Sequence, residues 1–214
     1  MELESLCRSA KAAKYEMQRY TTAQKNDALL KIADLLVANG EEIIAANAKD
    51  LENAQVKGMS VALQDRLRLT AARIEGMSEG LKQVAALPDP IGEVLETFDR
   101  PNGLKLAKVR VALVVIGIIY ESRPNVTADA FALTFKSGNV VILKGGSDAI
   151  HSNMAITKVI RSGLKECGIT EDAMGCPILS SMEVVQISTL PDGTPVYCDE
   201  NAAAADGIVI LNKV

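Results

Sequence analysis

The chain has 214 residues, of which 48% are hydrophobic and 23% charged, so it can form a folded core and disorder is not expected. Its formal net charge of −4 and aromatic content of 3% argue against nucleic acid as a partner, because they leave no broad basic face and few rings for base stacking. The longest apolar run, residues 111–120, is shorter than the ~20 residues that cross a membrane, and the acidic N-terminus does not resemble a secretory signal. The sequence therefore predicts a cytoplasmic protein with no membrane contact.

The residue counts also limit the chemistry. The single histidine, His151, cannot form a multi-histidine metal site, and a Ser-His-Asp triad would have to use it. The four cysteines, Cys7, Cys167, Cys176 and Cys198, contain no Cys-x-x-Cys pair, so free thiols and no metal site are predicted. Cysteine is the nucleophile that this composition favours.

The first 87 residues are predicted to be helical. One helix starts at the capping-box pair Thr21 and Gln24 and ends at Gly40. A second has apolar residues at spacings of three and four, begins near Thr70 and ends before Pro88. Short helices and connections are predicted between them, at residues 45–50 and 63–67.

The composition changes at residue 93. Residues 93–100 and 104–111, separated by an Asn-Gly turn, predict a β-hairpin. The following elements are predicted as a strand over 111–120, a helix over 127–137, a strand over 139–143 and a helix that ends at Gly168. Because both strands lack polar alternation, they predict half of a doubly wound parallel sheet of the nucleotide-binding type, with ligands beyond the carboxyl ends of the strands. In the tail, residues 194–198 predict a strand and 201–212 a helix, whereas 174–192 show no steady period.

Lys144-Gly145-Gly146-Ser147 lies between a predicted strand and a helix. The glycines allow close approach of a ligand, the N–H groups of the following helix attract an anion, and Lys144 adds a positive charge, so this segment is a candidate contact for a phosphate or ribose. The alternative is a tight turn in which Ser147 caps the helix and Lys144 is solvated. The segment matches neither a Walker loop nor a Gly-x-Gly-x-x-Gly fingerprint.

A second polar cluster, residues 121–127, follows the first strand of the predicted sheet. Asn125 can donate its amide to a developing oxyanion, and Arg123 offers a fork for a carboxylate or phosphate. The alternative is that Asn125 and Thr127 are ordinary helix-entry residues. His151 is predicted to be a polar residue in the first turn of a helix.

Residues 116–127 and 136–146 closely resemble the γ-glutamyl phosphate reductase family of the aldehyde dehydrogenase superfamily. Five upstream segments match the same family in the same order, namely residues 24–26, 46–50, 65–67, 87–92 and 101–104. The resemblance covers residues 7–173.

The resemblance implies an aldehyde-dehydrogenase-like α/β fold and a metal-free cysteine mechanism in proline biosynthesis. A thiolate attacks γ-glutamyl phosphate, phosphate leaves, and NADPH reduces the thioester to give glutamate 5-semialdehyde. By position, Asn125 resembles the oxyanion-hole asparagine of the superfamily. Likewise Lys144, Gly145, Gly146 and Ser147 resemble the contact to the adenosine ribose of the cofactor and its 2′-phosphate.

The sequence departs from the family pattern in three places. The family has Pro and Gly where this chain has Ala112 and Val114, and after Met174 much of the nucleotide-binding domain is missing. Residues 195–202 resemble the strand and turn ahead of the catalytic cysteine, but the sequence stops at Val214, before that cysteine. We therefore expect an internally deleted and truncated chain that does not contain the nucleophile.

Two functions remain open from the sequence. One is NADPH-dependent reduction of γ-glutamyl phosphate, and the other is a non-catalytic nucleotide-binding or subunit-pairing remnant of that family. Neither Cys198, on an apolar strand position, nor Cys176 is predicted to replace the nucleophile. The resemblance also implies a homodimer joined through the hairpin, with glutamate 5-kinase as a further partner. The predicted parts are the helical N-terminal part of a cofactor-binding domain (1–92), the hairpin arm (93–110), the nucleotide-binding core (111–173) and a remnant of later domains (174–214).

Overall fold

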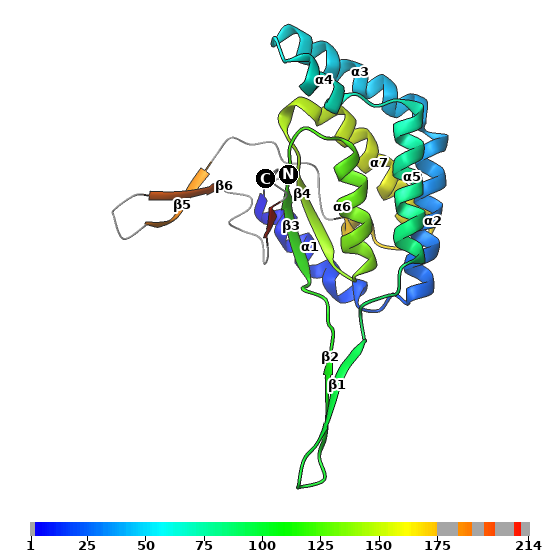
Figure 1. Ribbon diagram of the computed structural model, residues 1–214, viewed down its shortest axis with the longest axis vertical. Helices are drawn as coiled ribbons and strands as arrows, with labels where there is room; N and C mark the ends of the chain where they lie inside the picture. Colours follow the sequence, from blue (N-terminus) through cyan, green and yellow to red (C-terminus); the bar gives the residue numbers. More distant parts are fainter. Residues whose placement is uncertain (1–2, 175–183, 190–194, 200–207, 211–214) are drawn as a thin grey trace.

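A computed structural model describes residues 3–174, 184–189, 195–199 and 208–210. Among these residues, helices surround a small parallel sheet, and a two-stranded hairpin projects from one end of the molecule (Figure 1). Buried side chains of the helices and of the parallel strands join into one large hydrophobic cluster, which includes Phe131 and Phe135. The fold is thus of the predicted α/β class.

The N-terminal helices are α1 (Leu3–Met17), α2 (Thr22–Ala38), α3 (Gly40–Val56), α4 (Val61–Leu67) and α5 (Ala71–Ala86). The predicted capping box is present, since the Thr21 side chain accepts from the Gln24 N–H and the Gln24 side chain accepts from the Thr21 N–H. Helix α5 begins after Thr70, as predicted. Helix α3 is longer than the short helix predicted at 45–50, because Asn39 ends α2 and directly precedes α3 with no loop between them.

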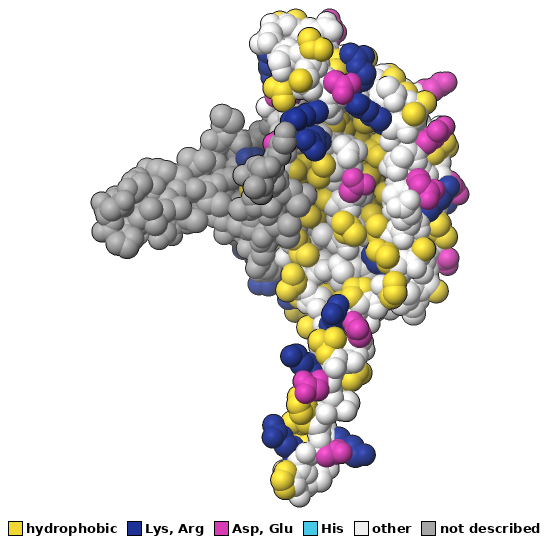
Figure 2. Space-filling model, in the orientation of Figure 1, with side chains coloured by type: hydrophobic (Ala, Val, Ile, Leu, Met, Phe, Trp, Pro, Cys, Tyr) yellow, Lys and Arg dark blue, Asp and Glu magenta, His cyan; other side chains and the backbone are white. Residues whose placement is uncertain are grey.

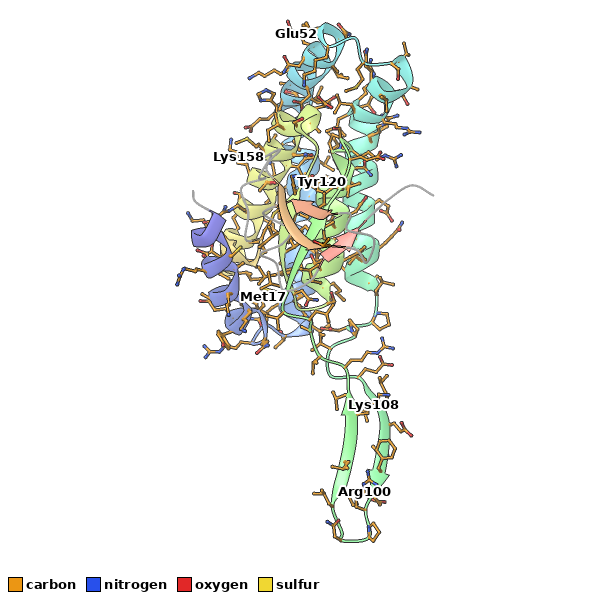
Figure 3. The ribbon with its side chains drawn as sticks, turned by 90° about the vertical axis from the view of Figure 1, so that its left-hand side faces the viewer. Met17, Glu52, Arg100, Lys108, Tyr120 and Lys158 are labelled. Atoms are coloured by element: carbon orange, nitrogen blue, oxygen red, sulfur yellow. The ribbon has the colours of Figure 1, made fainter. Side chains whose placement is uncertain are left out.

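The central sheet has three parallel strands in the order β4-β3-β7, namely β4 (Val140–Lys144), β3 (Val115–Ile119) and β7 (Ile208–Ile210). Val115 pairs with Val140 and Ile119 with Lys144, so the predicted parallel pairing is confirmed. Helix α6 (Asn125–Lys136) connects β3 to β4 and packs on β4, and α7 (Ile150–Glu166) follows β4. In Figure 3, α1 (violet) and α5 (teal) lie on opposite sides of the strands.

Strand β3 begins four residues later than predicted, because the backbone of Val114 is not extended. Its φ of 98° lies in the left-handed region, which a β-branched residue rarely adopts. The Val114 N–H donates to Asn139 Oδ1 over 2.8 Å, and its carbonyl accepts from the Val140 N–H over 2.9 Å. These bonds hold the strained residue in place at the point where the family, by resemblance, has a glycine.

The predicted hairpin is confirmed. Strands β1 (Val94–Asp99) and β2 (Lys105–Val109) pair antiparallel, and every residue from 94 to 109 is exposed in the described chain. Their apolar side chains, which include Val94, Phe98 and Leu106, are exposed, and Figure 2 shows hydrophobic side chains uncovered along the arm. A two-stranded ribbon with no packing partner is only marginally stable in water, so the arm has little support of its own.

A buried ionic cluster lies where the hairpin leaves the body. Lys25 on α2 forms an ion pair of 2.5 Å with Asp89 and donates to the carbonyl of Lys136. The Lys136 ammonium is itself buried and donates to the Ala85 carbonyl and to Asn26. The cluster therefore connects α2, the end of α5 and the end of α6.

The tail differs from prediction. Strand β6 (Pro195–Asp199) matches the predicted strand and pairs antiparallel with β5 (Val184–Thr189), which the sequence did not indicate. The helix predicted over 201–212 is wrong, because Ile208–Ile210 is strand β7 and pairs with β3. The rest of that predicted helix lies outside the described residues. None of the described helices has the length and apolar character needed to span a membrane.

Candidate functional site

The two polar clusters predicted from the sequence lie side by side. Strands β3 and β4 end together, since the Tyr120 N–H donates to the Lys144 carbonyl over 3.0 Å. Beyond these carboxyl ends, the backbone of Gly146 lies directly against Ser122, so the loop after β3 contacts the loop after β4. The structure thus brings residues 121–127 and 144–147 to one edge of the sheet, where α/β sheets bind ligands.

Packing within the chain already requires both glycines. A Cβ at Gly145 would overlap Asn153 and press on Tyr120, and a Cβ at Gly146 would overlap Ser122. Neither glycine has a positive φ, so their role is close packing rather than an unusual backbone conformation. The glycine pair is therefore explained without a ligand, and its predicted contact with a cofactor stays a prediction.

Two N–H groups at the start of α7 are bonded within the chain. Ser147–Ala149 forms a short 3₁₀ turn, and α7 begins only at Ile150. The N–H groups of His151 and Ser152 donate to the carboxylate of Asp50, a buried residue of α3. Two of the N–H groups that the sequence predicts for a ligand are therefore used within the chain, and the predicted anion contact stays a prediction. What remains at this end of β4 is the half-buried Lys144 and the exposed Ser147.

Buried polar side chains fix the elements around this edge. Asn47 on α3 donates to the Leu67 carbonyl and to Ser152, and it accepts from the Leu69 N–H over 2.7 Å. Together with Asp50, it connects α3 to α7 and to the segment between α4 and α5. Residues 46–50, which match the family in sequence, therefore have a structural role.

Asn125 is exposed at the first residue of α6. Its Nδ2 donates to Asp129 Oδ2 over 3.3 Å, one turn further along the helix. An amide nitrogen carries two hydrogens, so one remains for an oxyanion. Behind Asn125, the buried hydroxyls of Tyr120 and Thr127 are 2.7 Å apart, and Thr127 donates to Asn153. This chain of hydrogen bonds connects the start of α6 to β3 and α7.

A cavity of about 540 Å³ opens beside Asn125, between α5, α6 and the segment joining α4 to α5. Four arginines, Arg66, Arg68, Arg73 and Arg123, line it together with Asp65 and Asp129, and we call it the arginine cavity. Figure 2 shows basic side chains gathered at this end of the molecule. Burial raises the pKa of the Asp129 carboxyl, and the hydrogen bond from Asn125 opposes this only in part. A concave, positively charged surface of this size suits a small anionic molecule.

The sequence did not indicate this cavity. Arg66 belongs to a segment that matches the family, but Arg68 and Asp129 carry no motif. Residues 66–68 and 123–129 are far apart in sequence, and only the packing of α5 on α6 brings them together. Arg123, which was singled out as a fork for a carboxylate or phosphate, does line the cavity.

Comparison with known proteins gives close relatives. No family model matches the chain. A curated relative from Heliobacterium modesticaldum, named γ-glutamyl phosphate reductase, is 54% identical over 212 residues, which is 99% of this chain and 51% of the relative. A relative of the same name from Clostridium botulinum is 56% identical over 162 residues, or 76% of this chain and 39% of the relative. The chain is homologous to γ-glutamyl phosphate reductases. It spans about half the length, or less, of the curated relatives it matches.

Solved structures agree with this homology. The γ-glutamyl phosphate reductase of Thermotoga maritima has a TM-score of 0.79 and 44% identity, over 81% of this chain and 42% of its own. A glyceraldehyde-3-phosphate dehydrogenase of Methanocaldococcus jannaschii, solved with NADP, has a TM-score of 0.59 at 20% identity, over 80% of this chain and 35% of its own. Several aldehyde dehydrogenases share the fold at 10–20% identity. The predicted aldehyde-dehydrogenase-like fold is therefore confirmed.

The described cysteines of this γ-glutamyl phosphate reductase homologue do not suit a nucleophile. Cys7 and Cys167 are partly buried and pack against the hydrophobic core. Burial raises the pKa of Cys167, and Glu166 adds to this, while Lys31 lowers it; the net shift is upward. A thiol with a raised pKa supplies little thiolate at neutral pH. Cys176 lies outside the described residues, and for Cys198 the structure describes only its backbone, in β6.

Within the described residues of the homologue, no three histidine, cysteine or acidic side chains gather as a metal site would need. The single histidine, His151, lies exposed in the first turn of α7, as predicted. Its backbone N–H donates to Asp50 Oδ1. The arginine cavity and Asn125 are accordingly the candidate functional features of the described residues.

Proposed function

We propose that this segment serves an enzyme that reduces γ-glutamyl phosphate to glutamate 5-semialdehyde with NADPH, in proline biosynthesis. The observation that carries the proposal is the 54% identity to a γ-glutamyl phosphate reductase across 212 residues. The fold supports it, because the two candidate clusters lie together at the carboxyl edge of a parallel sheet.

Asn125 is the residue of this chain that acts on the reacting carbonyl. When a thiolate attacks the acyl carbon, negative charge develops on the carbonyl oxygen, and the second hydrogen of Asn125 Nδ2 can stabilise it. Asp129 and the packed start of α6 hold the amide in place. We propose that the thiolate comes from outside the described residues, since Cys7 and Cys167 do not fit the role.

Lys144 and Ser147 provide the donor set for NADPH, which supplies the hydride when bound. A cation and an exposed hydroxyl at the end of β4 fit an anionic group such as the ribose 2′-phosphate. The relative from Methanocaldococcus jannaschii, with the same fold, was solved with NADP. Preference for NADPH over NADH is accordingly part of the proposal.

A chimera tests the catalytic function. Residues 1–174 would replace the homologous segment of the Heliobacterium modesticaldum relative, and reduction of NADP⁺ would be followed with glutamate 5-semialdehyde and phosphate. We expect steady turnover, and Asn125→Ala should lower kcat about 100-fold or more, because an oxyanion donor is lost. We expect no measurable turnover from the 214-residue chain alone. A folded chimera with no turnover would contradict the proposal.

The second candidate function is subunit pairing without catalysis, and the exposed hairpin favours it. The apolar side chains of β1 and β2 are uncovered, and a ribbon of this kind gains stability by packing on another chain. We propose a homodimer joined through this arm. Light scattering at tens of micromolar should show a dimer, and Phe98→Ser should weaken it, whereas a monodisperse monomer would contradict the proposal. The partnership with glutamate 5-kinase stays a prediction.

A further inference from the structure

The arginine cavity contains positive charges that the described chain leaves unpaired. The guanidinium groups of Arg66 and Arg68 are exposed and form no ion pair or hydrogen bond within the described residues. Arg73 differs, because its guanidinium bonds Asp65 and the carbonyl of Arg68 and so supports the segment between α4 and α5. The guanidinium groups of Arg66 and Arg68 thus hold no other part of the described chain in place.

Arg123 adds a third donor to the same cavity. Its Nε forms an ion pair of 3.7 Å with Glu121 Oε2, but at that distance it makes no hydrogen bond, and this buried nitrogen has no hydrogen-bond partner among the described residues. A buried donor without a partner is costly, and a bound anion would satisfy it. The fork geometry of arginine suits a planar carboxylate, which can accept two parallel hydrogen bonds.

Asp129 places a negative charge in the same cavity. It is half-buried on α6, close to Gly80 of α5, and none of the described cations pairs with it. Its one described side-chain partner is Asn125, which lies one helical turn away on the same face of α6. The cavity therefore presents two cations, Arg66 and Arg68, and one carboxylate that form no ion pair among the described residues, near the residue that is proposed to face the reacting carbonyl.

We infer that the arginine cavity binds the α-amino-acid end of the substrate, with Arg66, Arg68 and Arg123 facing its carboxylate and Asp129 its ammonium group. Opposite charges across one cavity select a zwitterion over a simple anion, because each charge of the ligand meets its complement. The γ-acyl group of a bound glutamyl chain then lies on the side of Asn125. This inference rests on the proposed function and names the residues that select a glutamyl substrate.

Calorimetric titration of the 214-residue chain with four probes tests the inference. L-Glutamate carries both charges, glutarate lacks the amino group, 4-aminobutyrate lacks the α-carboxylate, and inorganic phosphate is a plain anion. L-Glutamate should bind most tightly. Arg68→Gln should weaken L-glutamate and glutarate about tenfold and leave 4-aminobutyrate unchanged, because one charge-assisted contact is lost. Asp129→Asn should weaken L-glutamate and 4-aminobutyrate and leave glutarate unchanged.

Arg100→Gln is the matched control, because Arg100 lies in the hairpin (Figure 3) and does not line the cavity, so its loss should not change binding. Thermal unfolding of each variant shows that it is folded. Phosphate binding that depends on Arg68, without glutamate binding, would overturn the inference, as would no binding of any probe. NADPH titrated into the same samples, together with the chimera, reports on the proposed function separately, since neither measurement depends on which probe fills the cavity.

Discussion

The two ends of the molecule use charged residues in opposite ways. At the end from which the hairpin projects, Lys25 and Lys136 are buried, Asp89 is half-buried, and each bonds to other parts of the chain. At the carboxyl edge of the sheet, Arg68 and Asp129 face a cavity and have no charged partner among the described residues. We call these the closed end and the open end. Charges at the closed end hold helices together, whereas those at the open end are placed to meet a ligand.

The pKa values of Asp89 and Asp129 are shifted in opposite directions, in line with this difference between the two ends. Burial alone would raise the pKa of Asp89, but hydrogen bonds from Lys25, the Ile91 N–H and Thr22 outweigh it, so the pKa lies below its ordinary value. Burial raises the pKa of Asp129, and the single hydrogen bond from Asn125 does not compensate. Asp89 therefore stabilises the folded chain in its charged form, and Asp129 carries a cost.

The largest expected effect is at the closed end. Asp89→Ala would leave the Lys25 ammonium buried without its carboxylate, which costs about 3–5 kcal/mol of the free energy of unfolding. Urea denaturation measures this value. The matched control is Glu42→Ala, which removes an exposed ion pair with Lys158 and should cost less than about 1 kcal/mol. Equal losses of stability in the two variants would contradict the distinction between the buried ion pair at the closed end and an exposed ion pair.

The same variant has a defined pH dependence. Because the pKa of Asp89 is lower in the folded chain, its contribution is fully present above the unfolded value of about 3.9 and is lost as the pH falls through the folded value. The stability difference between the wild type and Asp89→Ala should be constant near neutral pH and shrink below about pH 4. A difference that grows in acid would show that Asp89 is not charged in this cluster.

A smaller effect is expected at the open end, on binding rather than stability. Lys144→Ala should weaken NADPH about 10- to 100-fold and leave NADH nearly unchanged, since one charge-assisted contact is worth about 1.5–3 kcal/mol. Calorimetric titration with both nucleotides checks this. Equal losses for the two would show that Lys144 does not contact the 2′-phosphate.

Local signals in the sequence predicted the closed end better than the open end. The capping box at Thr21 and the hairpin turn depend on neighbouring residues, so their patterns are visible in the sequence. Strand β7 was mistaken for a helix because its pairing with β3 joins distant residues. The arginine cavity was missed for the same reason, since only tertiary packing brings Arg68 to Asp129.

Val114 tests whether the closed end stores strain. Val114→Gly should raise the free energy of unfolding by about 1 kcal/mol, because the relief of strain at a φ of 98° exceeds the entropic cost of glycine. The control is Ala112→Gly, where φ is negative and glycine should bring no gain. A loss of stability in Val114→Gly would mean that side-chain packing of the valine outweighs its backbone strain.

The smallest expected effect is at Asp129, and its sign is opposite to that at Asp89. The pKa of Asp129 is higher in the folded chain, so between the two pKa values the folded state keeps a proton that the unfolded state has released. Stability therefore falls as the pH rises through that window, and at neutral pH the full cost of the buried charge remains. Asp129→Asn removes the charge and can still accept from Asn125, so it should stabilise the chain by up to about 1 kcal/mol at pH 7 and by less in acid. Urea denaturation of both proteins at pH 7 and in acid measures this difference. A variant that is less stable than the wild type at pH 7 would mean that Asp129 has a cationic partner in the folded chain, so that its charge is not left for a ligand.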